Sequence, residues 1–207
     1  MKVLFFDIGY TLVNEDAVWA ARCREQADAE EAKRLRLTAD DICREIGLAS
    51  AAGLPQYRTV LDKYGIKTAA PYRLELETLY EDAPGVLETL AKRYALGVIA
   101  NQARGLAERL ESFGILPYFK YVISSSDVHA SKPDPRIFKY ALKAARCRPE
   151  EACMIGDRID NDVAPAKAVG MKTVWVRQGF GRLQTALAAA DPPDHTVDSL
   201  TQLTDLF

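Results

Sequence analysis

The chain has 207 residues, of which 48% are hydrophobic and 27% are charged, with a formal net charge of −2 at pH 7. These values are typical of a folded globular protein and exclude a disordered chain. The near-neutral charge gives no general reason to bind nucleic acid or an anionic membrane, so we expect neither as a partner.

The sequence contains no run of 18 apolar residues and no amino-terminal pattern of a secretory signal, which predicts a cytoplasmic protein. Its four cysteines form no CxxC pair, and only His129 and His195 could supply imidazoles. A zinc site would therefore lack ligands, and a catalytic triad would have only two histidines from which to take its base. Any chemistry must depend on carboxylates, and the oligomeric state is unknown at this point.

The first predicted element is a buried strand of apolar residues, 3–6, that runs into Asp7. Residues 14–82 follow, rich in Ala, Glu, Arg and Leu at helical spacing, and Thr38 with Asp41 is typical of a helix start. This second region is predicted to be entirely helical.

From about Pro84 the pattern changes to alternating helices and short apolar strands. Helices are predicted at 85–93, 105–113, 135–145 and 162–169, and strands at 95–100, 121–124, 152–155 and 173–176. This alternation indicates a parallel sheet covered on both faces. We therefore expect a doubly wound, Rossmann-like α/β core domain, residues 1–13 and 83–207, with an all-helical cap domain inserted at 14–82.

In such a sheet, ligands bind beyond the carboxyl ends of the strands. Polar residues follow three predicted strands, and a loop lysine is expected near them: Asp7, Asn101, Asp157 and Lys132. If their strands are neighbours, Asp7 and Asp157 repel each other unless a cation lies between them, and Mg²⁺ prefers such ligands. Asp162 could hold a metal-bound water, and Lys132 could bind phosphate.

Each of these residues also has a plain structural interpretation. Asp157 could cap a helix or form a turn, Asn101 could cap the helix beginning near Arg104, and Lys132 could be solvated. Their joint placement at strand ends of one sheet favours the functional interpretation.

Four stretches together resemble the motifs of the haloacid dehalogenase-like hydrolase superfamily, in order: FFDIGYTL, GVIAN, SKPDPRIF and MIGDRIDNDVAPAKAVGMKTVWV. The resemblance implies that Asp7 is the nucleophile, which forms an aspartyl phosphate. It implies Mg²⁺ ligands at Asp7, the Gly9 carbonyl and Asp157, with Asp162 as the last acidic residue of the motif. Lys132 would stabilise charge, and groups near Asn101 would bind the phosphate.

Two positions depart from the family pattern. Gly9 replaces the aspartate that serves as general acid and base, a role typically worth roughly 100- to 10,000-fold in rate. Ala100 replaces a Thr or Ser that hydrogen-bonds the phosphate, a bond worth about 1.5–3 kcal/mol. Tyr10, Glu15 and Asp16 are nearby residues that could replace the acid.

Several functions stay open on this pattern. The first is a Mg²⁺-dependent phosphohydrolase acting on small phosphorylated metabolites, with weakened acid–base catalysis. The second is a catalytically impaired protein that binds a phosphorylated ligand or a partner. A carbon–halogen hydrolase or a phosphonate hydrolase is the third; the latter needs a cap lysine, from Lys33, Lys63 and Lys67, that forms a Schiff base.

Overall fold

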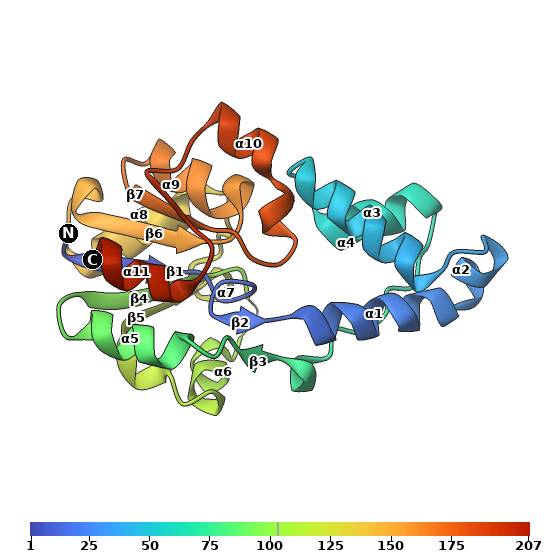
Figure 1. The fold of residues 1–207 in the computed structure, drawn as a ribbon, viewed down its shortest axis with the longest axis horizontal. Coiled ribbons are helices and arrows are strands. Elements are labelled where there is room, and N and C mark those ends of the chain that lie inside the picture. The colour runs from blue at the N-terminus through green and yellow to red at the C-terminus, as the bar shows by residue number, and fades with distance from the viewer. Residues whose placement is uncertain (103) are drawn as a thin grey trace.

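A computed structural model of the chain describes residues 1–102 and 104–207 (Figure 1). Its centre is a six-stranded parallel sheet in the order β5-β4-β1-β6-β7-β8. The strands are β1 Val3–Phe6, β4 Ala95–Ala100, β5 Phe119–Ser124, β6 Ala152–Gly156, β7 Lys172–Val176 and β8 His195–Val197. This confirms the predicted doubly wound α/β core, to which β8 adds a strand that was not predicted.

Helices cover both faces of this sheet (Figure 1). They are α5 Ala83–Ala91, α6 Leu106–Ser112, α7 Ser125–Val128, α8 Pro135–Ala145, α9 Ala164–Ala168, α10 Thr185–Ala190 and α11 Leu203–Leu206. The strand β1 is buried on both faces, which explains its uninterrupted apolar sequence.

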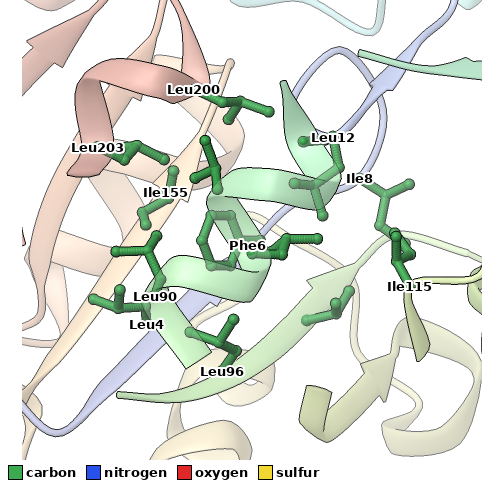
Figure 2. Close-up of a cluster of buried hydrophobic side chains, with 14 of the residues drawn as sticks. Leu4, Phe6, Ile8, Leu12, Leu90, Leu96, Ile115, Ile155, Leu200 and Leu203 are labelled. Atoms are coloured by element: carbon green, nitrogen blue, oxygen red, sulfur yellow. The ribbon is translucent and has the colours of Figure 1, made fainter. Parts of the chain in front are cut away.

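Alternate residues of β1 enter two separate hydrophobic clusters. Leu4 and Phe6 pack with α5 and with Leu203 of α11, as Figure 2 shows, whereas Val3 and Phe5 pack with α8 on the other face. Each of these side chains is at most 2% exposed, and burial of one such side chain contributes roughly 1.5–3 kcal/mol. The strand that carries Asp7 is therefore firmly held in the centre of the sheet.

Four helices between β1 and α5 extend to one side of the sheet (Figure 1): α1 Asp16–Asp28, α2 Glu30–Arg34, α3 Ala39–Ala51 and α4 Gln56–Tyr64. They have a hydrophobic cluster of their own, which includes Trp19, Ile42 and Tyr57. The start of α3 is the capping box expected from Thr38 and Asp41.

The chain enters and leaves this helical region through a short antiparallel ribbon, β2 Val13–Asn14 and β3 Thr78–Leu79. The prediction that the whole of 14–82 is helical is therefore wrong at its two ends. The two connecting segments run side by side there, and strand pairing satisfies their backbone groups. No helix of the described residues is long and apolar enough to cross a membrane.

The helix predicted at 162–169 is divided in two. Residues Ile159–Val163 form a π-helical turn, and α9 begins only at Ala164. In this turn the backbone N–H groups of Asp162 and Val163 both donate to the carbonyl of Arg158, at 2.8 and 3.2 Å. Such turns are often found at functional sites, and this one fixes the orientation of Asp162.

Candidate active site

Strand register brings the predicted site residues to one edge of the sheet. Phe6 of β1 lies opposite Val98 of β4 and Ile155 of β6, so the segments that follow these strands meet beside Asp7. The six residues predicted for catalysis, phosphate binding or metal binding line one cavity of about 230 Å³: Asp7, Gly9, Asn101, Lys132, Asp157 and Asp162.

Lys132 contributes a buried positive charge to this cavity. Its Nζ atom donates to Oδ1 of Asp7 and to Oδ1 of Asp162, both at 2.6 Å, and the residue is only 4% exposed. Burial by itself lowers the pKa of Lys132, but the carboxylates of Asp162 and Asp7 outweigh it and raise that pKa above its ordinary value. The lysine is therefore charged and firmly placed next to Asp7.

Asn101 holds the backbone of Lys132 from both sides. Its side-chain Nδ2 donates to the Lys132 carbonyl at 2.8 Å, and the Lys132 N–H donates to Oδ1 of Asn101 at 2.6 Å. The side-chain amide of Asn101 thus positions the lysine loop. Phosphate contacts near Asn101 would have to come from backbone groups, as the resemblance implies.

Three carboxylates converge beside this lysine. Oxygen atoms of Asp7, Asp157 and Asp162 all lie within 4.8 Å of one another. Burial and then the neighbouring Asp162 and Asp7 raise the pKa of Asp157 well above its ordinary value. Lys132 does not contact Asp157 among the ion pairs of the described residues. The charge of Arg158, which lines the same cavity, opposes the rise in the pKa of Asp157 only in part.

This donor set fits a divalent cation such as Mg²⁺, because all the donors are hard oxygens and the cluster carries excess negative charge. The two oxygens of Asp162 already have protein partners: Oδ1 accepts from Lys132, and Oδ2 accepts the backbone N–H of Arg158 at 3.0 Å. Asp7 and Asp157 are therefore the carboxylates best placed to bind a metal directly.

The space next to Gly9 holds the carboxyl group of Glu15. A Cβ atom built on Gly9 would lie 2.3 Å from Oε1 of Glu15, and Glu15 lines the same cavity as Asp7. Trp19 donates its indole N–H to Oε2 of Glu15 at 2.9 Å. Burial raises the pKa of the Glu15 carboxyl, and hydrogen bonds from Trp19 and Tyr72 oppose that shift.

The other two candidates for the missing acid lie differently. The hydroxyl of Tyr10 donates to Oδ1 of Asp16 at 3.1 Å. Asp16 lines a second, larger cavity of about 960 Å³ between the cap helices and the loop 177–183, which shares only Tyr10 with the first. No sequence pattern favours Glu15 over its neighbours, because no regular spacing governs this turn.

Arg109 is a site residue that the sequence analysis missed. It lies on α6, lines the cavity of Asp7, and its Nη2 is 3.9 Å from Oε1 of Glu15. Its Nε donates to Oε2 of the buried Glu77 at 2.9 Å, and its Nη1 donates to Gln102 at 2.7 Å. Glu77 comes from the segment that returns from the cap, so no sequence motif links the two residues.

Comparisons with known proteins agree with this geometry. The family model described as "Haloacid dehalogenase-like hydrolase" matches residues 4–176. A glyceraldehyde 3-phosphate phosphatase of Methanothermobacter thermautotrophicus is 27% identical over 228 aligned residues that cover both chains completely. One from Pyrococcus furiosus is 35% identical over 136 residues, 63% of this chain and 56% of the relative, so this match spans about half of the relative's length.

Among solved structures, a HAD phosphatase from Thermococcus onnurineus superimposes with a TM-score of 0.69 and 26% identity, covering 100% of this chain and 97% of that one. The family model covers most of the chain, and the structure brings residues of all four sequence motifs to one cavity. The chain belongs to the haloacid dehalogenase-like hydrolase family.

Proposed function

We propose that the protein is a Mg²⁺-dependent phosphohydrolase of small phosphorylated metabolites that acts through an aspartyl phosphate on Asp7. The observation that carries this proposal is the cluster itself: Asp7 faces a cavity with Lys132 at 2.6 Å and two further carboxylates within 4.8 Å. The relatives named glyceraldehyde 3-phosphate phosphatase support the choice of substrate class.

Each residue has a role in this reaction. An Asp7 oxygen attacks phosphorus, the bond to the leaving group breaks, and water later hydrolyses the aspartyl phosphate. Lys132 stabilises the negative charge that develops on the phosphoryl oxygens, and Asn101 holds the backbone of Lys132. Asp7, Asp157 and the carbonyl of Gly9 would hold the Mg²⁺ ion, which supplies positive charge to the phosphate when bound.

The size of the cavity favours a small substrate. At about 230 Å³ it is smaller than the roughly 300–1,000 Å³ typical of pockets for drug-sized ligands. Its lining is rich in charged side chains, and Ala100 contributes no hydroxyl to it. These features suit a phosphoryl group carried on a short carbon chain, bound without the hydrogen bond that a Thr or Ser at position 100 would add.

Position 9 restricts the leaving groups that the site can handle. Gly9 has no side chain to protonate an alkoxide, and general acid help of this kind is typically worth roughly 100- to 10,000-fold. If no other group supplies the proton, the enzyme should act on phosphates with good leaving groups and only slowly on alkyl phosphates.

An assay with and without Mg²⁺ tests the proposed function. The substrates are p-nitrophenyl phosphate, acetyl phosphate and glyceraldehyde 3-phosphate, and the variant is Asp7→Asn. We expect Mg²⁺-dependent turnover that falls by roughly 10⁴-fold or more in the variant, because the nucleophile is lost. Asp127→Asn is the matched control, since Asp127 is exposed in α7 and follows β5, which β4 separates from β1.

Turnover that depends neither on Asp7 nor on Mg²⁺ would contradict the proposal. A protein that binds phosphate or a phosphorylated metabolite without any turnover would instead support a binding function for this site.

A further inference from the structure

We propose that Glu15 supplies, at the leaving group, the carboxyl group that position 9 lacks, so that this site keeps its acid–base residue at a different place in the chain. This inference rests on the proposed phosphohydrolase function. It concerns which residue exchanges the proton, whereas the proposed function concerns Asp7, Lys132 and the metal.

The carboxyl group of Glu15 lies next to Gly9. A Cβ atom at residue 9 would meet Oε1 of Glu15 at 2.3 Å, its carboxyl carbon at 3.0 Å and Oε2 at 3.4 Å. The carboxyl group of Glu15 therefore occupies the space into which a side chain at position 9 would project. Because Gly9 has no side chain, that space is open to Glu15, and both residues line the cavity of Asp7.

Neighbouring side chains hold the Glu15 carboxyl group in place. Trp19, one helical turn further along α1, donates its Nε1–H to Oε2 at 2.9 Å. That bond leaves Oε1 directed toward Gly9, with Nη2 of Arg109 at 3.9 Å. The side chains of Glu15 and Arg109 are only 13% and 15% exposed. Glu15 is thus fixed in one orientation within the cavity and is largely shielded from bulk water.

The other two candidates for the acid, Tyr10 and Asp16, are hydrogen-bonded to each other. The Tyr10 hydroxyl donates to Asp16, and Asp16 is exposed and lines the larger cavity instead. Among the three nearby residues that could replace the acid, only Glu15 is a carboxylic acid that lines the cavity of Asp7.

The proposed steps balance in protons and bonds. When Asp7 attacks phosphorus, the bond from phosphorus to the leaving oxygen breaks, and the proton of the Glu15 carboxyl passes to that oxygen to give an alcohol. Water then attacks the phosphorus of the aspartyl phosphate and loses a proton to the Glu15 carboxylate. Inorganic phosphate leaves, the Asp7 carboxylate is restored, and Glu15 is protonated again.

The test compares two substrates in the Glu15→Gln variant, which keeps the shape of the side chain and an oxygen that can accept the Trp19 N–H. Glyceraldehyde 3-phosphate has an alkoxide leaving group that needs a proton, whereas p-nitrophenolate leaves without one. We expect kcat/KM for glyceraldehyde 3-phosphate to fall by about 100- to 10,000-fold and kcat/KM for p-nitrophenyl phosphate to stay nearly unchanged. Glu81→Gln, at an exposed glutamate in the segment that returns from the cap, is the control.

An equal fall for both substrates would overturn the inference, because it would mean that Glu15 only maintains the structure of the site. No fall for either substrate would also overturn it. If the unaltered protein shows no turnover that depends on Asp7, the proposed function itself fails, and the role of Glu15 fails with it. A wild-type protein that is active but shows one of the first two results refutes the role of Glu15 alone.

A pair of exchanged variants gives a second measurement. Gly9→Asp alone should force the flexible end of the Glu15 side chain to shift, because its Cβ would meet Oε1 of Glu15. Gly9→Asp combined with Glu15→Ala removes this contact and returns the carboxyl to position 9. We expect this double variant to be at least tenfold more active on glyceraldehyde 3-phosphate than Glu15→Ala alone, and equal activity of the two would contradict the exchange.

Discussion

The two sides of the cavity are built in different ways. On the core side, Asp7, Asn101 and Asp157 follow strands of one parallel sheet, and the register of β1 with β4 and β6 places them together. On the cap side, Glu15 and Gln56 reach the same cavity from the start of α1 and the start of α4, so sheet register does not place them. Their positions depend instead on how the helical cap packs on the core.

This difference teaches where the family pattern can vary. A carboxylate at a strand end cannot move without disturbing a sheet whose central strand is fully buried. A side chain on a connecting segment can approach the same cavity from several positions of the chain. Glu15 fits this view, because it reaches the space beside Gly9 from the start of α1 and not from a strand end.

Replacement of Lys132 should have the largest effect on stability, because it removes a buried charge from the core side of the cavity. Lys132→Met removes the cation that contacts Asp7 and Asp162 at 2.6 Å and leaves buried carboxylates without compensation. Removal of one partner of a buried ion pair typically costs 3–5 kcal/mol. We expect the free energy of unfolding in urea, without Mg²⁺, to fall by about 3–5 kcal/mol.

Lys139→Met is the matched control, because Lys139 is exposed on α8. If both variants had the same stability, the buried lysine cluster would not contribute to folding. The core side of the cavity would then be no more firmly built than the cap side.

A smaller effect is expected from Gln184, which joins the cap to the core. Its side chain is fully buried; it donates to the carbonyl of Ser50 in α3 at 2.8 Å and accepts the N–H of Ile159 at 2.7 Å. Gln184→Ala leaves the buried N–H of Ile159 unpaired, and such a group costs about 1–3 kcal/mol. It also removes the bond to the Ser50 carbonyl, which keeps the Gly53 N–H at 2.9 Å. We expect a loss of about 1–3 kcal/mol in unfolding free energy and faster amide hydrogen exchange near Ser50.

The control for this variant is Gln202→Ala, which removes an exposed amide that accepts the Asp198 N–H at 2.7 Å. Unchanged hydrogen exchange in α3 of Gln184→Ala would mean that the cap is held in place by its hydrophobic contacts and that Gln184 has no special role.

The core side could be predicted from the sequence because its signals are local. Apolar runs that end in Asp7 and Asp157 predict buried strands, and parallel strands share one edge for their carboxyl ends. Lys132 was predicted from its motif, and the structure adds its two carboxylate contacts. Asn101 was predicted next to the phosphate, but the sequence could not show that its side chain holds the Lys132 backbone.

The cap side could not be predicted in the same way. The helical pattern of 14–82 indicates which elements form, but the orientation of the cap on the core depends on contacts such as Gln184 with Ser50, 134 residues apart. Tyr10 adopts a positive φ of 52° directly after Gly9, a conformation that is uncommon for residues other than glycine. The path of the chain from Asp7 to Glu15 depends on this turn, and no periodic pattern reveals it.

The smallest effect is expected at the start of α3, where the cap depends on a local signal as the core does. The Thr38 hydroxyl accepts the Asp41 N–H at 3.1 Å, and the Asp41 carboxylate accepts the Thr38 N–H at 3.0 Å. Thr38→Ala should lower the unfolding free energy by about 0.5–2 kcal/mol, whereas Thr89→Ala on the exposed face of α5 should have almost no effect.

The pH dependence separates this cap from other causes of lost stability. Hydrogen bonds from Thr38 lower the pKa of Asp41 to about 2 from its ordinary value of 3.8. Because the pKa in the folded state is the lower one, the stabilising contribution is present above pH 3.8 and is lost as the pH falls through about 2. Urea unfolding of wild type and Thr38→Ala should therefore differ more at pH 6 than near pH 2, where the bond from the Asp41 N–H to the Thr38 hydroxyl still separates them. A difference of the same size at both pH values would mean that the bond between the Thr38 hydroxyl and the Asp41 carboxylate does not contribute to the stability of the start of α3.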